Sequence, residues 1–161
     1  MKIGLISDTH SWFGDDVNKY LNNVDEIWHA GDIGDISTAD KYKSLKPFRA
    51  VYGNIDGHEV RIEYPEYNLF KVDDLKILMI HIGGYPGRYS PRARQLIQEL
   101  KPDIFISGHS HILKIIPDKK NNLLHMNPGA CGKRGFQKLR TLILFEINKN
   151  NIENVQVVEL A

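Results

Sequence analysis

The stretch that decides the fold is KIGLISDTH, residues 2–10, at the start of the chain. Its apolar part, Lys2–Ser7, predicts a short buried strand, and the polar side chains of Asp8 and His10 follow that strand directly. The next strand-like stretch, Asp25–Ala30, is likewise followed by an aspartate. Short apolar strands that end in polar groups therefore organise the beginning of the chain.

Helix-like stretches alternate with the strands of the first half. Phe13–Asn23 has apolar residues at helical spacing, and Ser37–Leu45 is a second predicted helix that ends before Pro47. Phe48–Tyr52 then predicts a third strand. This β-α-β-α-β order with short connections predicts a parallel sheet with helices packed on it.

The second half of the chain has a different pattern. Tyr67–Val72 and Leu75–Ile82 flank two aspartates and predict a hairpin, and Pro91 begins a predicted helix. Further strands are expected at Asp103–Ser107, Leu113–Pro117, Leu123–Met126, Leu139–Ile147 and Asn151–Glu159. A parallel half followed by an antiparallel half indicates two sheets face to face with helices outside, an α/β or α+β fold.

Length and composition predict one globular domain covering residues 1–161. A hydrophobic fraction of 42% and a charged fraction of 25% exclude disorder. Lys and Arg number 21 against 20 Asp and Glu, so the net charge of +1 predicts no dedicated nucleic-acid surface. No apolar run approaches the roughly 20 residues that cross a bilayer, and we expect no membrane partner. The single cysteine, Cys131, fits a reducing compartment, and the predicted location is the cytoplasm.

Polar side chains gather where five of the predicted strands stop. They are Asp8 with His10, Asp32, Asn54, His81, and His109 with His111. Ligands in open α/β sheets bind outside the carboxyl ends of the strands, so these side chains are expected to lie close together. Members of the two i, i+2 pairs would point to the same side of an extended chain. A glycine precedes Asp32, Asn54 and His109, where the backbone must turn sharply or approach another group.

Taken singly, each of these residues has an ordinary structural explanation. An aspartate after a strand usually caps a helix or forms a turn, and His29, His58 and His125 are interpreted as structural histidines. The coincidence at five strand ends favours a metal site instead. Mixed imidazole and carboxylate ligands suit Mn, Fe, Ni or Zn better than Ca or Mg. No thiolate takes part, which excludes a structural zinc finger.

The motifs occur in an order that resembles a known family. Asp8-Thr9-His10, Gly31-Asp32, Gly53-Asn54, His81 and Gly108-His109-Ser110-His111 resemble the calcineurin-like metallophosphoesterases, most of all their small, single-domain bacterial and archaeal phosphodiesterase branch. The resemblance runs from Met1 to about Ala130, where Asn127-Pro128-Gly129-Ala130 is similar to that branch's Asn-Pro-Gly-Ser loop. It implies a four-layer α/β/β/α sandwich of two mixed sheets flanked by helices.

The resemblance also implies a centre of two divalent metal ions. Position by position, Asp8, His10 and His111 would hold one ion, and Asn54, His81 and His109 the other. Asp32 would bridge the ions and hold a shared hydroxide, the nucleophile, while Asn54 would also face a phosphate oxygen. The expected metal is Mn²⁺, with Ni²⁺, Fe²⁺ or Zn²⁺ as alternatives.

The chain departs from the broad family pattern at three positions. Ile55 follows the site asparagine where the wider family has its general-acid histidine; the small branch shares this loss, and the general acid stays unassigned. Ile82 separates His81 from the glycines that follow, and Ala130 replaces the usual serine.

Two further segments carry weaker functional signals. Gly83–Arg88 is expected to be a flexible loop in which Tyr85 or Arg88 contacts substrate. The basic residues Lys133, Arg134, Lys138 and Arg140 are interpreted as a solvated strand edge.

The function expected from these features is phosphodiester hydrolysis, with a small phosphoester as substrate. The alternatives are a phosphomonoesterase and a non-catalytic protein-binding scaffold, as in a eukaryotic trafficking-complex subunit that resembles this fold. Every ligand position is filled, which favours the enzyme. The pattern leaves open the physiological substrate and the oligomeric state, and it is compatible with a homo-oligomer.

Overall fold

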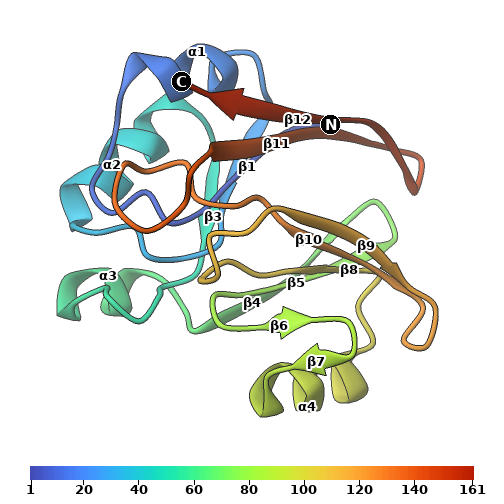
Figure 1. The fold of residues 1–161 in the computed structure, drawn as a ribbon. Helices are drawn as coiled ribbons and strands as arrows, with labels where there is room; N and C mark the ends of the chain where they lie inside the picture. Colours follow the sequence, from blue (N-terminus) through green and yellow to red (C-terminus); the bar gives the residue numbers. More distant parts are fainter.

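A computed structural model describes residues 1–161 as two five-stranded sheets packed face to face, with helices on the outside (Figure 1). The helices are α1 (Asp15–Leu21), α2 (Ile36–Leu45), α3 (His58–Glu63) and α4 (Pro91–Leu100). The strands are β1 (Lys2–Ile6), β2 (Glu26–His29), β3 (Phe48–Ala50), β4 (Tyr67–Val72), β5 (Leu75–Ile80), β6 (Gly84–Tyr85), β7 (Arg88–Tyr89), β8 (Ile104–Ile106), β9 (Lys114–Asp118), β10 (Leu123–Asn127), β11 (Arg140–Asn148) and β12 (Asn151–Leu160). The predicted sandwich of two mixed sheets is confirmed.

Both sheets combine parallel and antiparallel strands. The first has the order β12-β11-β1-β2-β3, in which β1, β2 and β3 are parallel and β11 is antiparallel to β1. The second has the order β4-β5-β8-β10-β9, in which β5, β8 and β10 are parallel. The predicted division into a parallel and an antiparallel half is therefore wrong. The hairpin of β11 and β12 returns to the first sheet because β1 would otherwise present an unpaired edge.

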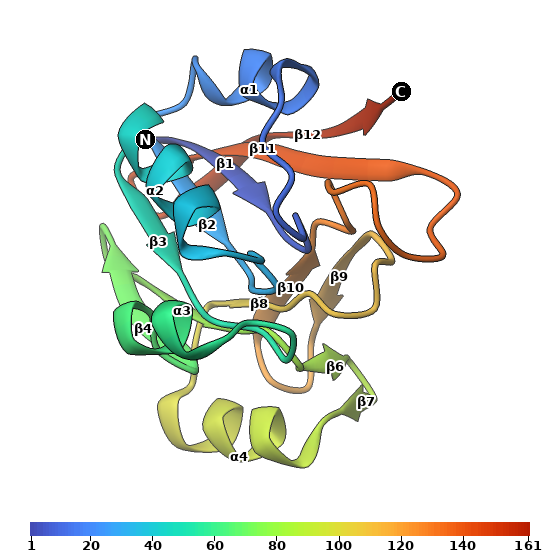
Figure 2. The ribbon, with the colours of Figure 1, turned by 90° about the vertical axis from the view of Figure 1, so that its left-hand side faces the viewer.

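Four apolar clusters hold the layers together, and three of them join the sheets to each other and to α1 and α4. Between the sheets, Trp28 lies fully buried with residues such as Ile3, Met79 and Phe145. α1 covers the outer face of the first sheet, and α4 covers the outer face of the second, where its residue Leu96 packs (Figure 2). Since each sheet is apolar on both faces, the four layers follow from burial alone.

Several predicted elements are shorter than expected, and three were missed. The helix predicted from Phe13 begins at Asp15, because Gly14 at its N-cap has an extended backbone. The helix at Pro91 is as predicted, with the side chain of Ser90 accepting a hydrogen bond from the Ala93 amide. α3 is only six residues long, and β6 and β7, of two residues each, pair as a hairpin within the segment expected to be a loop. Elements this short leave no readable periodicity.

No helix in this fold has the length and apolar character that crossing a membrane would require.

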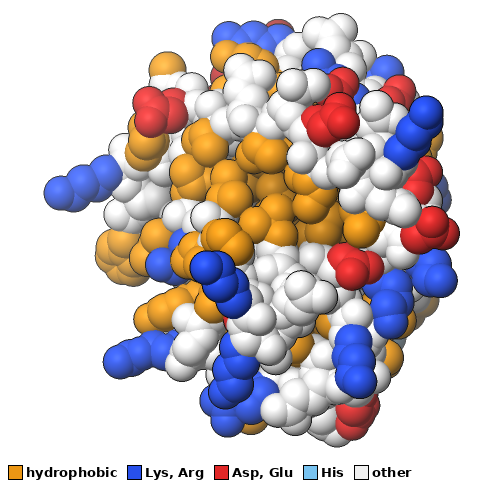
Figure 3. Space-filling model, turned by 90° about the vertical axis from the view of Figure 1, so that its right-hand side faces the viewer, with side chains coloured by type: hydrophobic (Ala, Val, Ile, Leu, Met, Phe, Trp, Pro, Cys, Tyr) orange, Lys and Arg blue, Asp and Glu red, His pale blue; other side chains and the backbone are white.

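The strands of the sandwich share one polar end and one apolar end. The carboxyl ends of β1, β2 and β3 meet the loops after β5 and β8 at the end that faces the viewer in Figure 2. Figure 3 shows the opposite end, where apolar side chains gather in the middle of the face. The β4–β5 and β11–β12 turns lie at this end (Figure 1). Leu75 and Ile152 follow these turns; they are partly buried and pack against the core between the sheets.

Two buried histidines carry a pH-dependent contribution to stability. His29 and His125 are fully buried, and burial lowers the pKa of His29 to about 3 and that of His125 to about 4. The His125 ring stacks on Phe105, and its Nε2 has no hydrogen-bond partner. Both rings are therefore neutral in the folded protein at neutral pH, as expected for structural histidines.

We predict that His125→Asn flattens the acid limb of the stability profile. A histidine whose folded pKa lies below its ordinary value of 6.5 stabilises the fold above pH 6.5, and this stability is lost as the pH falls toward 4. Between pH 7 and pH 4 the free energy of unfolding should fall by about 3 kcal/mol less in the variant than in the wild type. Urea unfolding at each pH measures this difference. His58→Asn, at an exposed position, is the matched control; parallel profiles for wild type and His125→Asn would contradict the prediction.

Candidate metal centre

The polar residues at the strand ends come together in two groups. Asp8, His10 and His111 form one, and Asp32, His81 and His109 form the other; in each group the potential ligand atoms lie within 4.8 Å of one another. The seventh predicted residue, Asn54, belongs to the second group. Its Oδ1 lies 3.0 Å from His81 Nε2 and 3.0 Å from His109 Nδ1. The structure thus brings together the seven residues expected as metal ligands.

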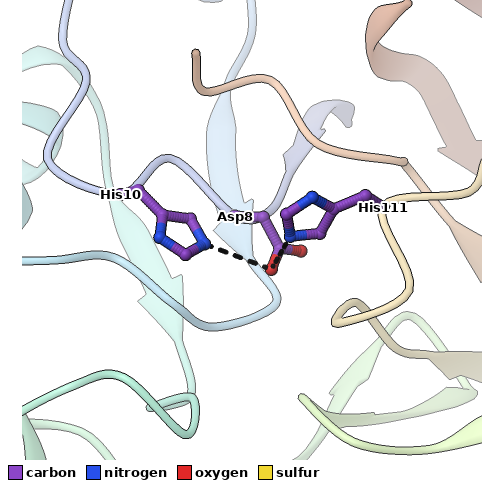
Figure 4. Close-up of side chains that lie close together, drawn as sticks. All are labelled: Asp8, His10 and His111. Atoms are coloured by element: carbon purple, nitrogen blue, oxygen red, sulfur yellow. Dashed lines mark ion pairs between the residues drawn. The ribbon is translucent and has the colours of Figure 1, made fainter. Parts of the chain in front are cut away.

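The first group is centred on the carboxylate of Asp8. In Figure 4 the rings of His10 and His111 approach the same carboxylate oxygen from two sides, at 3.8 and 3.1 Å from Nε2 to Oδ1. The other oxygen, Oδ2, accepts hydrogen bonds from Ser7 Oγ and the His109 amide. Asp8 is fully buried, yet its Oδ1 and the Nε2 of His10 make no hydrogen bond. A bound ion or water is one explanation for buried polar atoms that lack partners.

Asp32 lies between the two groups. Its Oδ2 is 3.2 Å from His81 Nε2 and 3.5 Å from His10 Nε2, so it faces one histidine of each group. Its Oδ1 accepts a hydrogen bond from the Ile55 amide at 3.0 Å, which fixes the plane of the carboxylate. This is the place that a ligand shared by two cations would occupy.

Hydrogen bonds set the tautomers of two histidines. His81 Nδ1 donates to the carbonyl of Ala30 at 2.7 Å, and His111 Nδ1 donates to Gln137 Oε1 at 2.8 Å. In the neutral ring the lone pair of Nε2 then points into the site, as in metal-ligating histidines. His81 Nε2 lies 3.0 Å from Asn54 Oδ1 and 3.2 Å from Asp32 Oδ2. A cation at this place could contact one nitrogen and two oxygens.

The charges at the site influence one another. Burial opposes ionisation of Asp8, but contact with His10 and His111 lowers its pKa below the ordinary value. Burial likewise opposes ionisation of Asp32, and its contact with His81 lowers the pKa. In turn the pKa of His81 is raised by Asp32 against the effect of burial, and that of His111 is raised by Asp8. The carboxylates are thus ionised and oriented for cations.

The two i, i+2 pairs are not in extended backbone, and that part of the prediction is wrong. Asp8, His10, His109 and His111 have φ values of 54°, 45°, 70° and 61°, and Asp32 has 56°. These left-handed conformations are uncommon outside glycine and cluster at functional sites. Because of them His109 and His111 point into different groups, whereas an extended chain would have directed both to one side.

The glycines before the site residues have the predicted role. Gly31 has φ of 98°, and a Cβ there would lie 2.6 Å from Nδ1 of His81. A Cβ on Gly53 would collide with the Asp32 carboxylate, and one on Gly108 would collide with Ser7 Oγ. These close approaches let loops from the two sheets meet.

The remaining predicted residues lie around the site. Tyr85 and Arg88 line a cavity of about 230 Å³ beside His109, where the Lys114 ammonium lies 4.5 Å from the centre of the Tyr85 ring. Ile55 is 47% exposed and has no proton to donate from its side chain.

Two expectations about the C-terminal half have opposite outcomes. Cys131 is buried, as expected for a small apolar residue. The interpretation of Arg140 as part of a solvated edge is wrong. Its guanidinium donates to the Cys131 carbonyl and pairs with Asp16 at 2.8 Å, because β11 lies between β1 and β12 and is no edge strand.

Sequence reasoning missed three residues that orient the ligands: Ser7, Gln137 and Asp56. The buried Asp56 carboxylate accepts hydrogen bonds from the amides of Ile33, Gly34 and Gly53 and so joins the loops that carry Asp32 and Asn54. Only Asp56 had a readable signal, since it follows the Gly53-Asn54 motif; Gln137 lies in a loop without pattern.

Comparison with known proteins agrees with this geometry. The sequence model of the calcineurin-like phosphoesterase superfamily domain matches residues 1–150. A probable metallophosphoesterase of Methanothermobacter thermautotrophicus is 35% identical over 135 residues, which cover 81% of this chain and 77% of that protein. One of Methanocaldococcus jannaschii is 35% identical over 150 residues, which cover 86% and 75%.

Solved structures share the fold at lower identity. A Vps29 from Entamoeba histolytica complexed with Zn²⁺ has a TM-score of 0.76 at 20% identity and covers 99% of this chain and 98% of its own. A structure described as a novel archaeal phosphodiesterase has a TM-score of 0.73 at 24% identity and covers 99% and 100%. With the family match across most of its length, this chain belongs to the calcineurin-like phosphoesterase superfamily.

Proposed function

We propose that this metallophosphoesterase is a two-metal phosphodiesterase. Asp8, His10 and His111 hold one divalent cation, Asn54, His81 and His109 hold the other, and Asp32 contacts both. The observation that carries the proposal is the position of Asp32 Oδ2 between a histidine of each group, at 3.2 and 3.5 Å. Mn²⁺ is the proposed native metal, and the same donors are compatible with Ni²⁺, Fe²⁺ or Zn²⁺.

The residues present fit two cations. Asp8 Oδ1 and His10 Nε2 are buried without hydrogen-bond partners, and a cation would satisfy both. In the second group, Asn54 Oδ1 lies 3.0 Å from a nitrogen of each of two histidines, an arrangement that a shared cation explains. Ionised carboxylates in both groups offset the positive charge.

When bound, such a metal pair supplies a water of lowered pKa and charge stabilisation for a phosphoryl group in an in-line displacement. The chain supplies the positioning. Ile55 and Asp56 fix the loop that presents Asn54, and Gly31 lets His81 reach the first sheet. The Nδ2 group of Asn54 makes no hydrogen bond within the protein, so it is free to donate to a phosphate oxygen.

Two cavities beside the second group support a diester as the substrate. One, of about 500 Å³, is lined by Asn54 and His81, and the other, of about 230 Å³, is lined by His109. Ile82 and Ser90, at the base of the β6–β7 hairpin, line both cavities. A phosphate between Asn54 and His109 can therefore direct one ester arm to each side, whereas a monoester has a single arm.

A protein-binding scaffold is the second candidate. It is favoured by the apolar end of the sandwich in Figure 3 and by the shared fold with Vps29. A scaffold does not require every ligand position to be filled, so metal content and turnover separate the two candidates. Comparison of phenyl phosphate with diphenyl phosphate separates a monoesterase from a diesterase.

We predict that Asp32→Asn abolishes diester hydrolysis and lowers metal content from two ions to less than one per chain. The neutral amide removes the shared negative charge, and two cations then repel each other across it. Metal content is measured by mass spectrometry on protein purified without chelator. Asp40→Asn, exposed on α2, is the control and should keep both ions. An Asp32→Asn variant with two ions and near-normal turnover would refute the bridging role.

Two further substitutions should each weaken one metal position. Gln137→Leu removes the acceptor that orients His111 and should lower affinity at the Asp8 group by about 10–100-fold. Asn54→Ala removes a ligand and should empty the second position while the first stays populated. Anomalous scattering at the metal absorption edge reads the two positions separately. Equal losses at both positions in either variant would contradict this partition.

The absence of a general acid should show in the leaving-group dependence. His58 is exposed at the start of α3 and makes no hydrogen bond to the site, and Ile55 cannot donate a proton. General-acid help is worth about 10²–10⁴-fold for poor leaving groups, so the rate should fall steeply across substituted phenyl diesters as the leaving-group pKa rises. His58→Ala should behave as the wild type does. A flat dependence that becomes steep in His58→Ala would show that His58 is the acid.

A further inference from the structure

The cavity of about 500 Å³ beside the site is lined by charged and apolar side chains that are not candidate metal ligands. It opens on Asn54 and His81 and lies between the loop after β3, the end of β5 and the start of α4. Its volume is within the range of cavities that hold small organic molecules. Nothing in the metal centre requires this space, since the ligands of both groups are held by other contacts.

Two guanidinium groups line this cavity, one anchored to the backbone and one in an exposed ion pair. Arg61 lies over the Tyr52 ring, 4.5 Å from its centre, and donates from Nε to the Asp56 carbonyl at 2.6 Å. Its Nη2 lies 3.3 Å from the Asn54 carbonyl, so this planar cation is anchored to the backbone of a site residue. Arg92 pairs with Glu66 at 2.9 Å. With two guanidinium groups and one carboxylate, the cavity carries a net positive charge.

Apolar surface completes the lining. Ile80, Ile82 and Pro91 contribute side chains, and Ile82 is 44% exposed although it directly follows His81. A Tyr ring, planar guanidinium groups and aliphatic side chains are the surfaces on which aromatic rings and nucleobases stack. The accessible surface of this cavity is mostly apolar, which favours a flat ring over a sugar or a polyol.

We propose that this cavity binds a flat aromatic or heteroaromatic arm of the phosphodiester, and that Tyr52, Arg61 and Arg92 determine this specificity. The inference rests on the proposed function for the position of the phosphate at Asn54. An arm attached to that phosphate enters the cavity past Ile82 and meets the Tyr52–Arg61 pair.

The test compares two probes that differ only in the arm, phenylphosphonate and methylphosphonate. Each is titrated into Zn²⁺-loaded protein whose isoleucine methyl groups carry ¹³C, and Kd is read from the methyl signals. We expect phenylphosphonate to bind about tenfold more tightly and to shift the signals of Ile80 and Ile82. Arg92→Met, at an exposed position, and Tyr52→Leu should each reduce the ratio of the two Kd values severalfold.

Arg94→Met is the matched control, because Arg94 is on the same helix but lines a different cavity. It should leave the ratio unchanged. Equal Kd values for the two probes, or a ratio that survives both cavity variants, would overturn the proposal.

Binding and turnover separate the two hypotheses. A protein that hydrolyses diesters without preferring phenylphosphonate refutes only the aromatic specificity. A protein that prefers phenylphosphonate, through Tyr52 and Arg92, but hydrolyses no ester refutes the phosphodiesterase and leaves the cavity assignment standing.

Discussion

The buried carboxylate of Asp8 is the constraint on which the rest of the site depends. One of its oxygens accepts hydrogen bonds from Ser7 and from the amide of His109, which comes from the second sheet. A second link between the sheets is the bond from His81 Nδ1 to the Ala30 carbonyl. An ionised group without water is costly to bury, so it persists only where partners of this kind surround it. The hydrogen bonds that link the two sheets at this end are thus the same ones that assemble the site.

The backbone around these residues is held in an unfavourable conformation. Five ligand residues have φ between 45° and 70°, and residues in such regions cost about 1–3 kcal/mol each. Hydrogen bonds between loops oppose that cost, for example from the Asp8 amide to the Gly31 carbonyl and from the His10 amide to the Asp32 carbonyl. These bonds join the loops that carry the site residues to one another. Polar groups held in place in this way suit the metal-dependent chemistry of the phosphoesterase superfamily.

The short elements around the site have a different role from the sheets. α3 and the β6–β7 hairpin contribute no candidate metal ligand, yet they border the two cavities beside the site. Arg61 of α3 also contacts the backbone of Asn54, so the lining of the larger cavity is joined to the site. The candidate ligands thus lie at strand ends, whereas short connections form the walls of the neighbouring cavities.

The sequence by itself determined which residues meet at the candidate metal centre and the class of fold. Asp8, Asp32 and Asn54 follow apolar strands, and parallel strands end at one edge of a sheet, so local pattern is sufficient to bring them together. Tertiary structure decided what depends on contacts between distant segments. The return of β11 and β12 to β1, the orientation of His111 by Gln137, and the opposite directions of His109 and His111 arise from such contacts and from left-handed backbone. The cavity lined by Tyr52, Arg61 and Arg92 also depends on contacts between distant segments. No periodicity encodes these features, because periodicity reports only neighbours within one element.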